Sequence, residues 1–576
     1  MMAMTPPSSS PLLALLAARD LDAPLAWRHG EPISARRYLA DVQRLAQTLP
    51  AEGPAVNLCG DRYLFAVALG AALLRGQPSL LPPDTRHDTL ARLQQPGGKL
   101  YAITDDAALT PPAGMATLRI DAAALDAAAA SDEVGAVPQI DAGQHAVSLL
   151  TSGSTGVPQP HAKTWRTLVG DVAAAVKQLS ALLGKPSLDG LTLVATVPVQ
   201  HSYGLESSAL LAMLGGAAFD SGRPFFPADI AAALASVPRP RALVTTPFHL
   251  KTLLLAGIAL PPVDFILSAT APLSPQLAQQ AEQALGGPMI EIYGSTESGQ
   301  VATRRTTQTD IWQTFGEIRV TRQADGPEGE RFVFHGDFMP EPIAMADVLE
   351  LVDDQHFRLF GRANDLVHVA GRRSSLGHLN YHLNSIPGVR DGAFWLPDEV
   401  VDGVVRTVAF VVAPELSAAD IGAALRQRIE SVFVPRRIVH VAALPREATG
   451  KLTVRTLREF ALAQLAAQGD TLRFTREVPA DHPSFAGHFP GQPLLPGALL
   501  LAEVMEVMRQ VPALQARLGA TPVLAAAKFL APVRPGDPLA IELVPEAAPA
   551  TGLRFEVRVG ATLVASGRWL PAPEQG

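Results

Sequence analysis

A run of hydroxyl side chains and glycines from Thr151 to Gly156 is the first feature of this chain that could do chemistry. It directly follows the apolar run 146–150, which is typical of a buried strand. Glycines let a backbone approach an anion closely, and amide N–H groups and hydroxyls donate hydrogen bonds to it. The run therefore predicts a loop that binds phosphates, although by itself it also suits a solvated turn. It lacks the Gly-Lys-Ser/Thr ending of a Walker A motif.

Four further motifs follow this loop along the chain. They are Tyr293-Gly-Ser-Thr-Glu297, Asp347, Gly361-Arg-Ala-Asn-Asp365 and Gly450-Lys451. Taken singly, each also fits an ordinary surface acid, turn or solvated lysine. In this order, the motifs resemble the acyl-adenylate-forming superfamily, which includes acyl-CoA synthetases, nonribosomal adenylation domains and luciferases.

The resemblance implies activation of a small-molecule carboxylic acid by ATP and Mg²⁺, followed by transfer to a pantetheine thiol. That chemistry needs a cation where charge builds up as the carboxylate attacks the α-phosphorus. The resemblance implies that Lys451 is this cation, that Thr296 binds the α-phosphate, and that Glu297 and Thr151 bind Mg²⁺. It implies cofactor-binding roles for Thr151, Ser152, Gly153, Ser154, Thr155, Gly156, Tyr293, Gly294, Ser295, Asp347 and Arg362.

The same resemblance assigns residues to the acyl and pantetheine paths. It implies that His201, Ser268 and Ala269 line the acid pocket, that Gly371 lets the pantetheine arm pass, and that Asn364 is the hinge of a mobile domain. A core histidine is the competing interpretation of His201. The chain also departs from the family pattern, because Gln159 stands where lysine is usual. Lys163, four residues on, is a candidate to replace that charge.

Composition narrows the classes of protein further. The 576 residues carry a net charge of −8, and no block of Lys and Arg offers a nucleic-acid surface. Cys59 is the single cysteine, so a disulfide framework and a cysteine-based metal site are excluded, and we expect a buried thiol. No apolar run reaches the roughly 20 residues of a membrane span, and no positive segment precedes the N-terminal apolar run. We expect a cytoplasmic protein.

The elements that must position these residues follow from periodicity. Short β-rich runs at 191–197, 242–246, 264–268 and 289–293 alternate with helical stretches, which predicts a parallel sheet covered on both faces. Ligand sites then lie where such strands end. We predict an α/β multidomain fold: a large adenylate-forming N-terminal domain with βα layers (1–360), a small mobile α+β domain (361–467), and a C-terminal α+β domain (468–576).

The C-terminal domain has its own motif. Phe485 to Gly497 and Lys528 to Asp537 resemble the hotdog-fold 3-hydroxyacyl-carrier-protein dehydratases, in which a long helix is wrapped by an antiparallel sheet. The strict alternation of 553–559 agrees with such a sheet. The resemblance implies that His488 is the catalytic base. The partner carboxylate would fall at Ala502, so Glu503 is the candidate acid, one helical step of about 100° away.

Together these features predict an acyl-adenylating ligase fused to a dehydratase-like hotdog domain, as in aryl-polyene and xanthomonadin pigment pathways. That likeness favours a hydroxybenzoic or hydroxycinnamic acid, with either CoA or an acyl carrier protein as the thiol acceptor. The alternative is a fatty acyl-CoA or acyl-carrier-protein ligase whose hotdog module only dimerises or docks a carrier. We expect a homodimer through the hotdog domain, because a single unit leaves a sheet edge uncovered.

Overall fold

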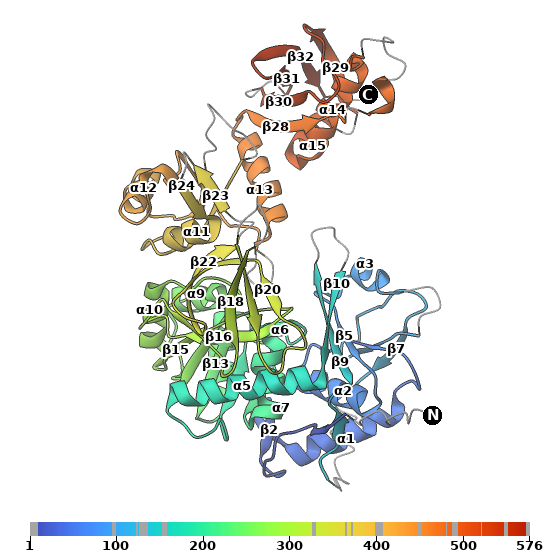
Figure 1. Cartoon of the computed structure of the whole chain (residues 1–576), viewed down its shortest axis with the longest axis vertical. Coiled ribbons are helices and arrows are strands. Elements are labelled where there is room, and N and C mark those ends of the chain that lie inside the picture. Colours follow the sequence, from blue (N-terminus) through green and yellow to red (C-terminus); the bar gives the residue numbers. More distant parts are fainter. Residues whose placement is uncertain are drawn as a thin grey trace, which may run out of the picture. The chain divides into compact units, whose positions relative to one another are not determined.

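The computed structural model describes most of the chain as two compact units, Met1–Asn364 and Asp365–Gly576. Figure 1 shows their elements. A few residues, including Thr151, Ser152 and Arg362, are described by their backbone alone. The described ranges are 10–94, 99–121, 125, 136–152, 158–324, 330–362, 366–369, 372–397, 407–446, 452–479, 481–485, 493–519, 521–546 and 551–571.

An eleven-stranded sheet organises the first unit, in the order β21-β22-β17-β16-β15-β14-β13-β11-β12-β2-β3. The four predicted strands are confirmed as β11 (Thr192–Ala195), β13 (Arg241–Thr245), β14 (Phe265–Ser268) and β15 (Met289–Ser295). They pair in parallel, whereas pairing is antiparallel from β15 through β16, β17 and β22 to β21. The sheet is therefore mixed, not wholly parallel as expected. Its other strands are β2 (Pro24–Arg28), β3 (Glu31–Ser34), β12 (Ala218–Asp220), β16 (Gly299–Arg304), β17 (Trp312–Thr314), β21 (Asp347–Leu351) and β22 (His356–Arg362).

A second sheet of the first unit has six strands, in the order β10-β9-β5-β4-β6-β7. The phosphate-loop segment connects β9 and β10, which pair as antiparallel neighbours with Ser152 opposite Pro158. The strands of this sheet and of the smaller ones are β4 (Ala55–Asn57), β5 (Ser79–Leu81), β6 (Tyr101–Thr104), β7 (Ala116–Arg119), β9 (His145–Ser152), β10 (Pro158–Thr164), β1 (Leu12–Ala14), β8 (Gln139–Asp141), β18 (Arg319–Ala324), β19 (Glu330–His335) and β20 (Ile343–Met345).

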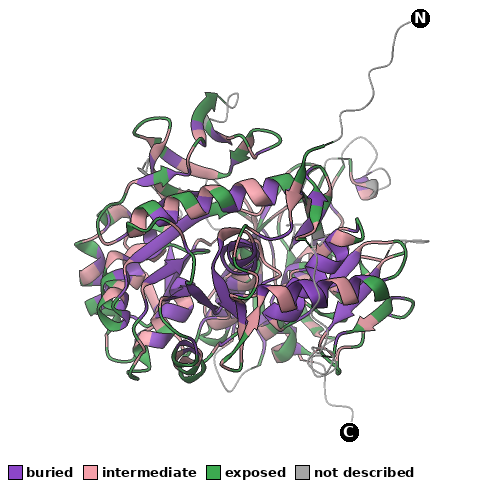
Figure 2. Ribbon diagram, turned by 90° about the horizontal axis from the view of Figure 1, so that it is seen from below, coloured by how far each residue is buried: buried purple, intermediate pink, exposed green. Residues whose placement is uncertain are grey.

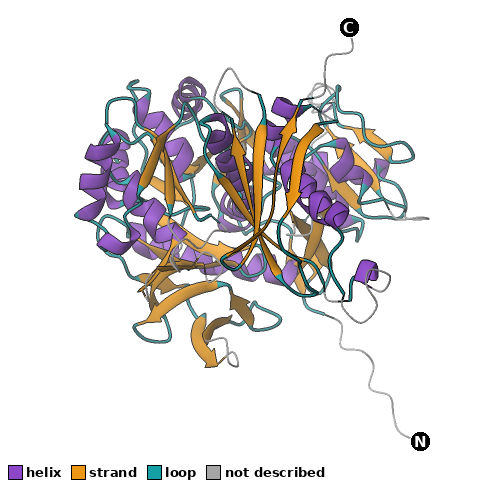
Figure 3. Ribbon diagram, turned by 90° about the horizontal axis from the view of Figure 1, so that it is seen from above, coloured by secondary structure: helices purple, strands orange, loops and turns teal. Residues whose placement is uncertain are grey.

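Helices cover these sheets, as Figure 3 shows. The longest, α5 (Trp165–Leu183), begins where the Thr164 side chain accepts the backbone N–H of Thr167, and it ends at Gly184 in the left-handed region (φ +63°). The others are α1 (Ala35–Thr48), α2 (Arg62–Leu74), α3 (His87–Ala91), α6 (Ser202–Gly204), a π-helix (Leu205–Leu210), α7 (Leu211–Gly215), α8 (Pro227–Ser236), α9 (Pro247–Leu255) and α10 (Pro275–Leu285).

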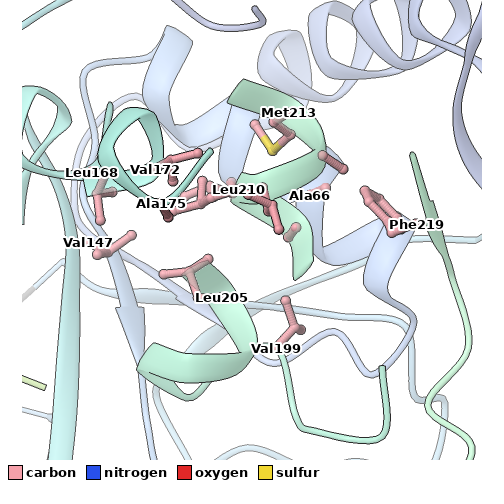
Figure 4. Close-up of a cluster of buried hydrophobic side chains, with 14 of the residues drawn as sticks. Ala66, Val147, Leu168, Val172, Ala175, Val199, Leu205, Leu210, Met213 and Phe219 are labelled. Carbon is pink, nitrogen blue, oxygen red and sulfur yellow. The ribbon is translucent and has the colours of Figure 1, made fainter. Parts of the chain in front are cut away.

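The core of the first unit lies between α2, α5, the π-helix and the sheets. Leu168, Val172 and Ala175 recur at helical spacing along α5 and meet Leu205 and Leu210 of the π-helix (Figure 4). This spacing gives α5 one apolar face. Most strands are buried, while the outer faces of the helices are exposed (Figure 2). Cys59 is buried and free, as expected.

The second unit begins with a small α+β region. Ser417 and Asp420 form a capping box at the start of α12, which ends at Arg426 and is followed by a short 3₁₀ turn (Ser431–Phe433). The elements are β23 (Leu366–Val369), β24 (Arg372–Ser375), α11 (Leu376–Asn384), β25 (Asp391–Trp395), β26 (Val408–Val412), α12 (Ala418–Arg426), β27 (Arg437–His440) and α13 (Val454–Ala467).

The predicted antiparallel sheet around a central helix is confirmed in the last hundred residues. Its order is β28-β30-β31-β32-β29, and every pairing is antiparallel. Leu553, Phe555 and Val557 of β31 are buried. The elements are β28 (Leu472–Glu477), α14 (Gly497–Arg509), α15 (Pro512–Leu518), β29 (Val523–Phe529), β30 (Pro538–Pro545), β31 (Leu553–Val559) and β32 (Thr562–Leu570). None of the helices in the described part of the chain has the length and hydropathy of a bilayer span.

Candidate active site

Tyr293 and Asp347, far apart in the sequence, meet in the first unit. The Tyr293 hydroxyl donates a hydrogen bond of 2.9 Å to Asp347 Oδ2. The Tyr293 ring is buried against Trp312, Phe334 and Phe357, with centroids 5.5 to 6.0 Å away. Asp347 begins β21 and lies opposite Arg362 in the register of β21 and β22. Three residues expected at the nucleotide are thus brought to one place.

The turn after β15 is tightly constrained. The backbone N–H of Ser295 donates to Ser298 Oγ at 3.0 Å, and that of Ser298 donates to Ser295 Oγ at 3.1 Å. A Cβ on Gly294 would lie 2.1 Å from the carbonyl oxygen of Gly299, so only glycine fits. This turn carries Thr296 and Glu297 at a fixed place beside the strand ends.

Glu297 is held in its ionised form. Burial opposes ionisation most strongly, but hydrogen bonds from its own backbone N–H and from Ser295, with the charges of His161 and Lys163, lower the pKa of the Glu297 carboxyl below its usual range. His161 Nε2 lies 3.6 Å from Glu297 Oε1. Mg²⁺ commonly binds through one or two carboxylates and substrate phosphates, so Glu297 fits the metal. The described residues contain no cluster of three His, Cys, Asp or Glu side chains for a metal.

The phosphate loop is only partly described. Thr151 and Ser152 end β9. The side chains of these two residues, and Gly153, Ser154, Thr155 and Gly156 entirely, lie outside the described residues.

The expected acid-pocket residues lie at the ends of the parallel strands. Ser268 is the last residue of β14, and its buried Oγ has no hydrogen-bond partner within the described part of the chain. Ala269 follows it and is buried. His201, half-buried, precedes α6. Tyr203 lies against the ends of β13 and β14. Its hydroxyl donates to the carbonyl oxygens of Thr245 (3.1 Å) and Leu267 (2.9 Å).

Three charged residues near this site were missed or misjudged from the sequence. Lys163 does not reach out in place of the loop lysine: it is 5% exposed and donates to the main-chain oxygen of Glu297. Asp171 and Glu206, each 2% exposed, lie near it. Acidic residues on the apolar faces of α5 and the π-helix were the pattern that could have revealed them.

Four key motif residues lie outside the described residues: Asn364, at the end of the first unit, and Gly371, Lys451 and His488 of the second unit. Glu503 of α14 is not free, since its Oε2 lies 2.9 Å from Arg476 Nε of β28. Ala502 is exposed. On this helix Ala502 therefore faces solvent, whereas the Glu503 carboxylate forms an ion pair with Arg476.

Tyr293, Asp347 and Arg362 thus meet in a mixed sheet, and a small α+β region follows them in the chain, as the resemblance led us to expect. The chain belongs to the AMP-binding enzyme family, whose model matches residues 17–320. The AMP-binding enzyme C-terminal domain matches residues 382–451, and the ApeI dehydratase family matches residues 464–568. The protein is therefore an AMP-forming acyl ligase that carries a C-terminal dehydratase-family domain.

One curated relative and two solved structures illustrate what this chain is similar to, the structures in fold alone. A 4-coumarate–CoA ligase of Rhodobacter capsulatus is 30% identical over 305 residues, which cover 52% of this chain and 73% of the relative. The ATP-bound structure of MatB from Rhodopseudomonas palustris superposes with a TM-score of 0.64 at 19% identity, covering 77% of this chain and 96% of MatB. The o-succinylbenzoate CoA synthetase of Bacillus subtilis, in complex with ATP and magnesium, gives 0.62 at 17% identity, with coverage of 76% and 97%.

Proposed function

We propose that this ligase activates an aromatic acid, of the hydroxybenzoic or hydroxycinnamic type, and passes it to a pantetheine thiol in an aryl-polyene-type pathway. The observation that carries the proposal is the pairing on one chain of a ligase similar to 4-coumarate–CoA ligase with an ApeI dehydratase-family domain. A chain-elongating pathway on acyl carrier protein needs an activated starter acid, and a hotdog domain of a dehydratase family is suited to bind acyl carrier protein even where its own dehydratase activity is weak. We therefore propose carrier protein as the acceptor, with CoA as the alternative, in the cytoplasm.

In this proposal, residues of the first unit bind the ribose and the phosphates of ATP and the Mg²⁺ ion. Asp347, oriented by the Tyr293 hydroxyl, accepts hydrogen bonds from the ribose with Arg362 beside it. The loop Thr151 to Gly156 binds the phosphates, Thr296 binds the α-phosphate, and Glu297 with Thr151 holds Mg²⁺, which neutralises phosphate charge. Lys451 supplies the cation for the charge that grows as the carboxylate attacks. His201, Ser268 and Ala269 line the acid pocket, Gly371 faces the pantetheine arm, and Asn364 is the hinge.

A pyrophosphate-exchange screen over hydroxybenzoic, hydroxycinnamic and medium-chain to long-chain fatty acids tests the substrate class. We expect the aromatic acids to support exchange with kcat/KM at least about tenfold above the fatty acids, a difference of about 1.4 kcal/mol in transition-state binding. A preference for fatty acids would instead favour the alternative, a fatty acyl-CoA or acyl-carrier-protein ligase.

We propose that the hotdog domain pairs with a second copy of itself and has little dehydratase activity. Strand β29 lies at the end of its sheet, with no strand partner on its outer side among the described residues. Val523 and Phe529, at its two ends, are 44% and 52% exposed, and Leu530, just after it, is 56% exposed. An exposed apolar edge is a ready surface for a second strand. His488 is the proposed base, and Ala502 stands where its acid partner is needed.

A further inference from the structure

Lys163 of β10 is buried inside the first unit. Its side chain is 5% exposed, and its Nζ donates a hydrogen bond to the main-chain oxygen of Glu297. Burial, the largest effect, lowers the pKa of the Lys163 ammonium, and the nearby Glu206, Asp171 and Glu297 carboxylates oppose that shift. A buried ammonium is costly unless it is paired and hydrogen-bonded, so this position of Lys163 is specific.

Asp171 of α5 holds the other end of the same turn. Its Oδ1 accepts the backbone N–H of Gln300 at 3.2 Å. Gly299 has a φ of +73°, and a Cβ there would lie 3.1 Å from Asp171 Oδ2. The main chain from Glu297 to Gln300 is therefore held at both ends by buried ionisable side chains, one from β10 and one from α5.

Glu206 connects these groups to the segment that carries Tyr203. Its Oε1 accepts a hydrogen bond of 2.7 Å from Ser202. Burial, the main effect, raises the pKa of Glu206 to about 7, against the attraction of Lys163. Glu206 lies on the π-helix, which packs against α5, and such helices often occur at functional sites. Removing Lys163 alone would leave two buried carboxylates without their cation.

We propose that Lys163 is a positioning residue for adenylation: it fixes the main chain of Glu297, together with Asp171 at Gln300, so that the Glu297 carboxylate is held ready for Mg²⁺. Lys163 does not contact a phosphate in this role. The inference rests on the proposed function of Glu297 as the Mg²⁺ ligand.

The test compares the full-length Lys163→Met/Glu206→Gln variant with wild type and with Lys177→Met, an exposed lysine on α5. The double variant removes the cation together with one of its buried carboxylate partners. Hydrogen exchange of the ligand-free protein should rise about tenfold in amides 295–300. In ATP-binding calorimetry, the half-saturating Mg²⁺ concentration should rise about five- to tenfold. ATP binding without Mg²⁺ should be unchanged, and the Lys177 variant should match wild type.

Unchanged exchange at 295–300, or weaker ATP binding in the absence of Mg²⁺ with an unchanged Mg²⁺ dependence, would overturn the proposal. If the double variant does not fold, Lys163→Arg is measured instead, because it keeps the charge but not the contact geometry. It should show the same two changes, smaller in size, and their absence overturns the proposal. Glu297→Gln separates the two inferences: if it leaves the Mg²⁺ dependence unchanged, the proposed role of Glu297 fails.

Discussion

Tyr293 links two parts of the proposed nucleotide site by one hydrogen bond. Its ring is fixed by Trp312, Phe334 and Phe357, so its hydroxyl can orient Asp347 without further ordering cost. Tyr293→Phe keeps the ring and removes that donor, so we expect KM for ATP to rise about three- to tenfold while kcat stays within about twofold, as for a lost uniform binding interaction. Pyrophosphate exchange at varied ATP measures both values. A fall in kcat at constant KM would contradict this role for Asp347.

Lys451 is the residue on which the chemical step should depend most. In its proposed role the charge of Lys451 acts mainly in the transition state, so Lys451→Ala should reduce adenylate formation by several orders of magnitude and leave ATP binding largely intact. Single-turnover assays measure the loss of adenylation, and calorimetry measures the retained ATP binding. Lys177→Met is the control for both. Exchange of pyrophosphate at the wild-type rate would show that the assignment is wrong.

At the scale of the element, helix α14 decides whether the hotdog domain can eliminate water. Ala502 is exposed, and Glu503, one residue on, is engaged by Arg476 of β28. We expect slow or no dehydration of 3-hydroxyacyl carrier protein by wild type, and a gain of up to about 10² to 10⁴ in Ala502→Asp, the usual contribution of a positioned acid. Steady-state dehydration assays compare the two. Fast wild-type turnover that Glu503→Gln abolishes would instead make Glu503 the acid.

At the scale of the whole molecule, the proposed dimer should form through β29. Val523→Lys/Ala525→Lys places charges on its exposed positions and should weaken the dimer at least about tenfold while adenylation is retained. Light scattering over a concentration series measures this, with Thr521→Lys, just before the strand, as the control. A dimer of unchanged affinity would place the interface elsewhere.

Truncation after Ala467 also tests whether the hotdog domain forms the dimer, but it disturbs the core, because α13 packs on α15. Leu462 and Leu465 of α13 belong to the buried cluster that also contains Leu514 and Leu518 of α15. A truncated chain would expose these side chains, and the expected monomer could be obscured by association of the new apolar face. Substitution on β29 leaves this core intact, so it is the better experiment.

Local patterns in the sequence predicted the strands discussed above and the class of enzyme. The alternation at 553–559 predicted β31 with its bounds, and the apolar runs predicted β11, β13, β14 and β15. Alternation of apolar and polar residues, or a continuous apolar run, indicates which side chains of a strand are buried even when its neighbouring strands are unknown. The ordered motifs from Thr151 to Lys451 likewise identified an acid-activating ligase before any contact was known.

Which distant residues meet could not be predicted from local patterns and was seen first in the folded chain. The switch to antiparallel pairing after β15 follows from strand partners that local periodicity does not specify. From the sequence, Lys163 was a candidate phosphate contact, whereas the fold buries it against Glu297, 134 positions away, with Asp171 and Glu206 nearby. Similarly, Glu503 is taken up by Arg476 from another element. A charged side chain is placed by what packs around it, and that packing is a property of the whole fold.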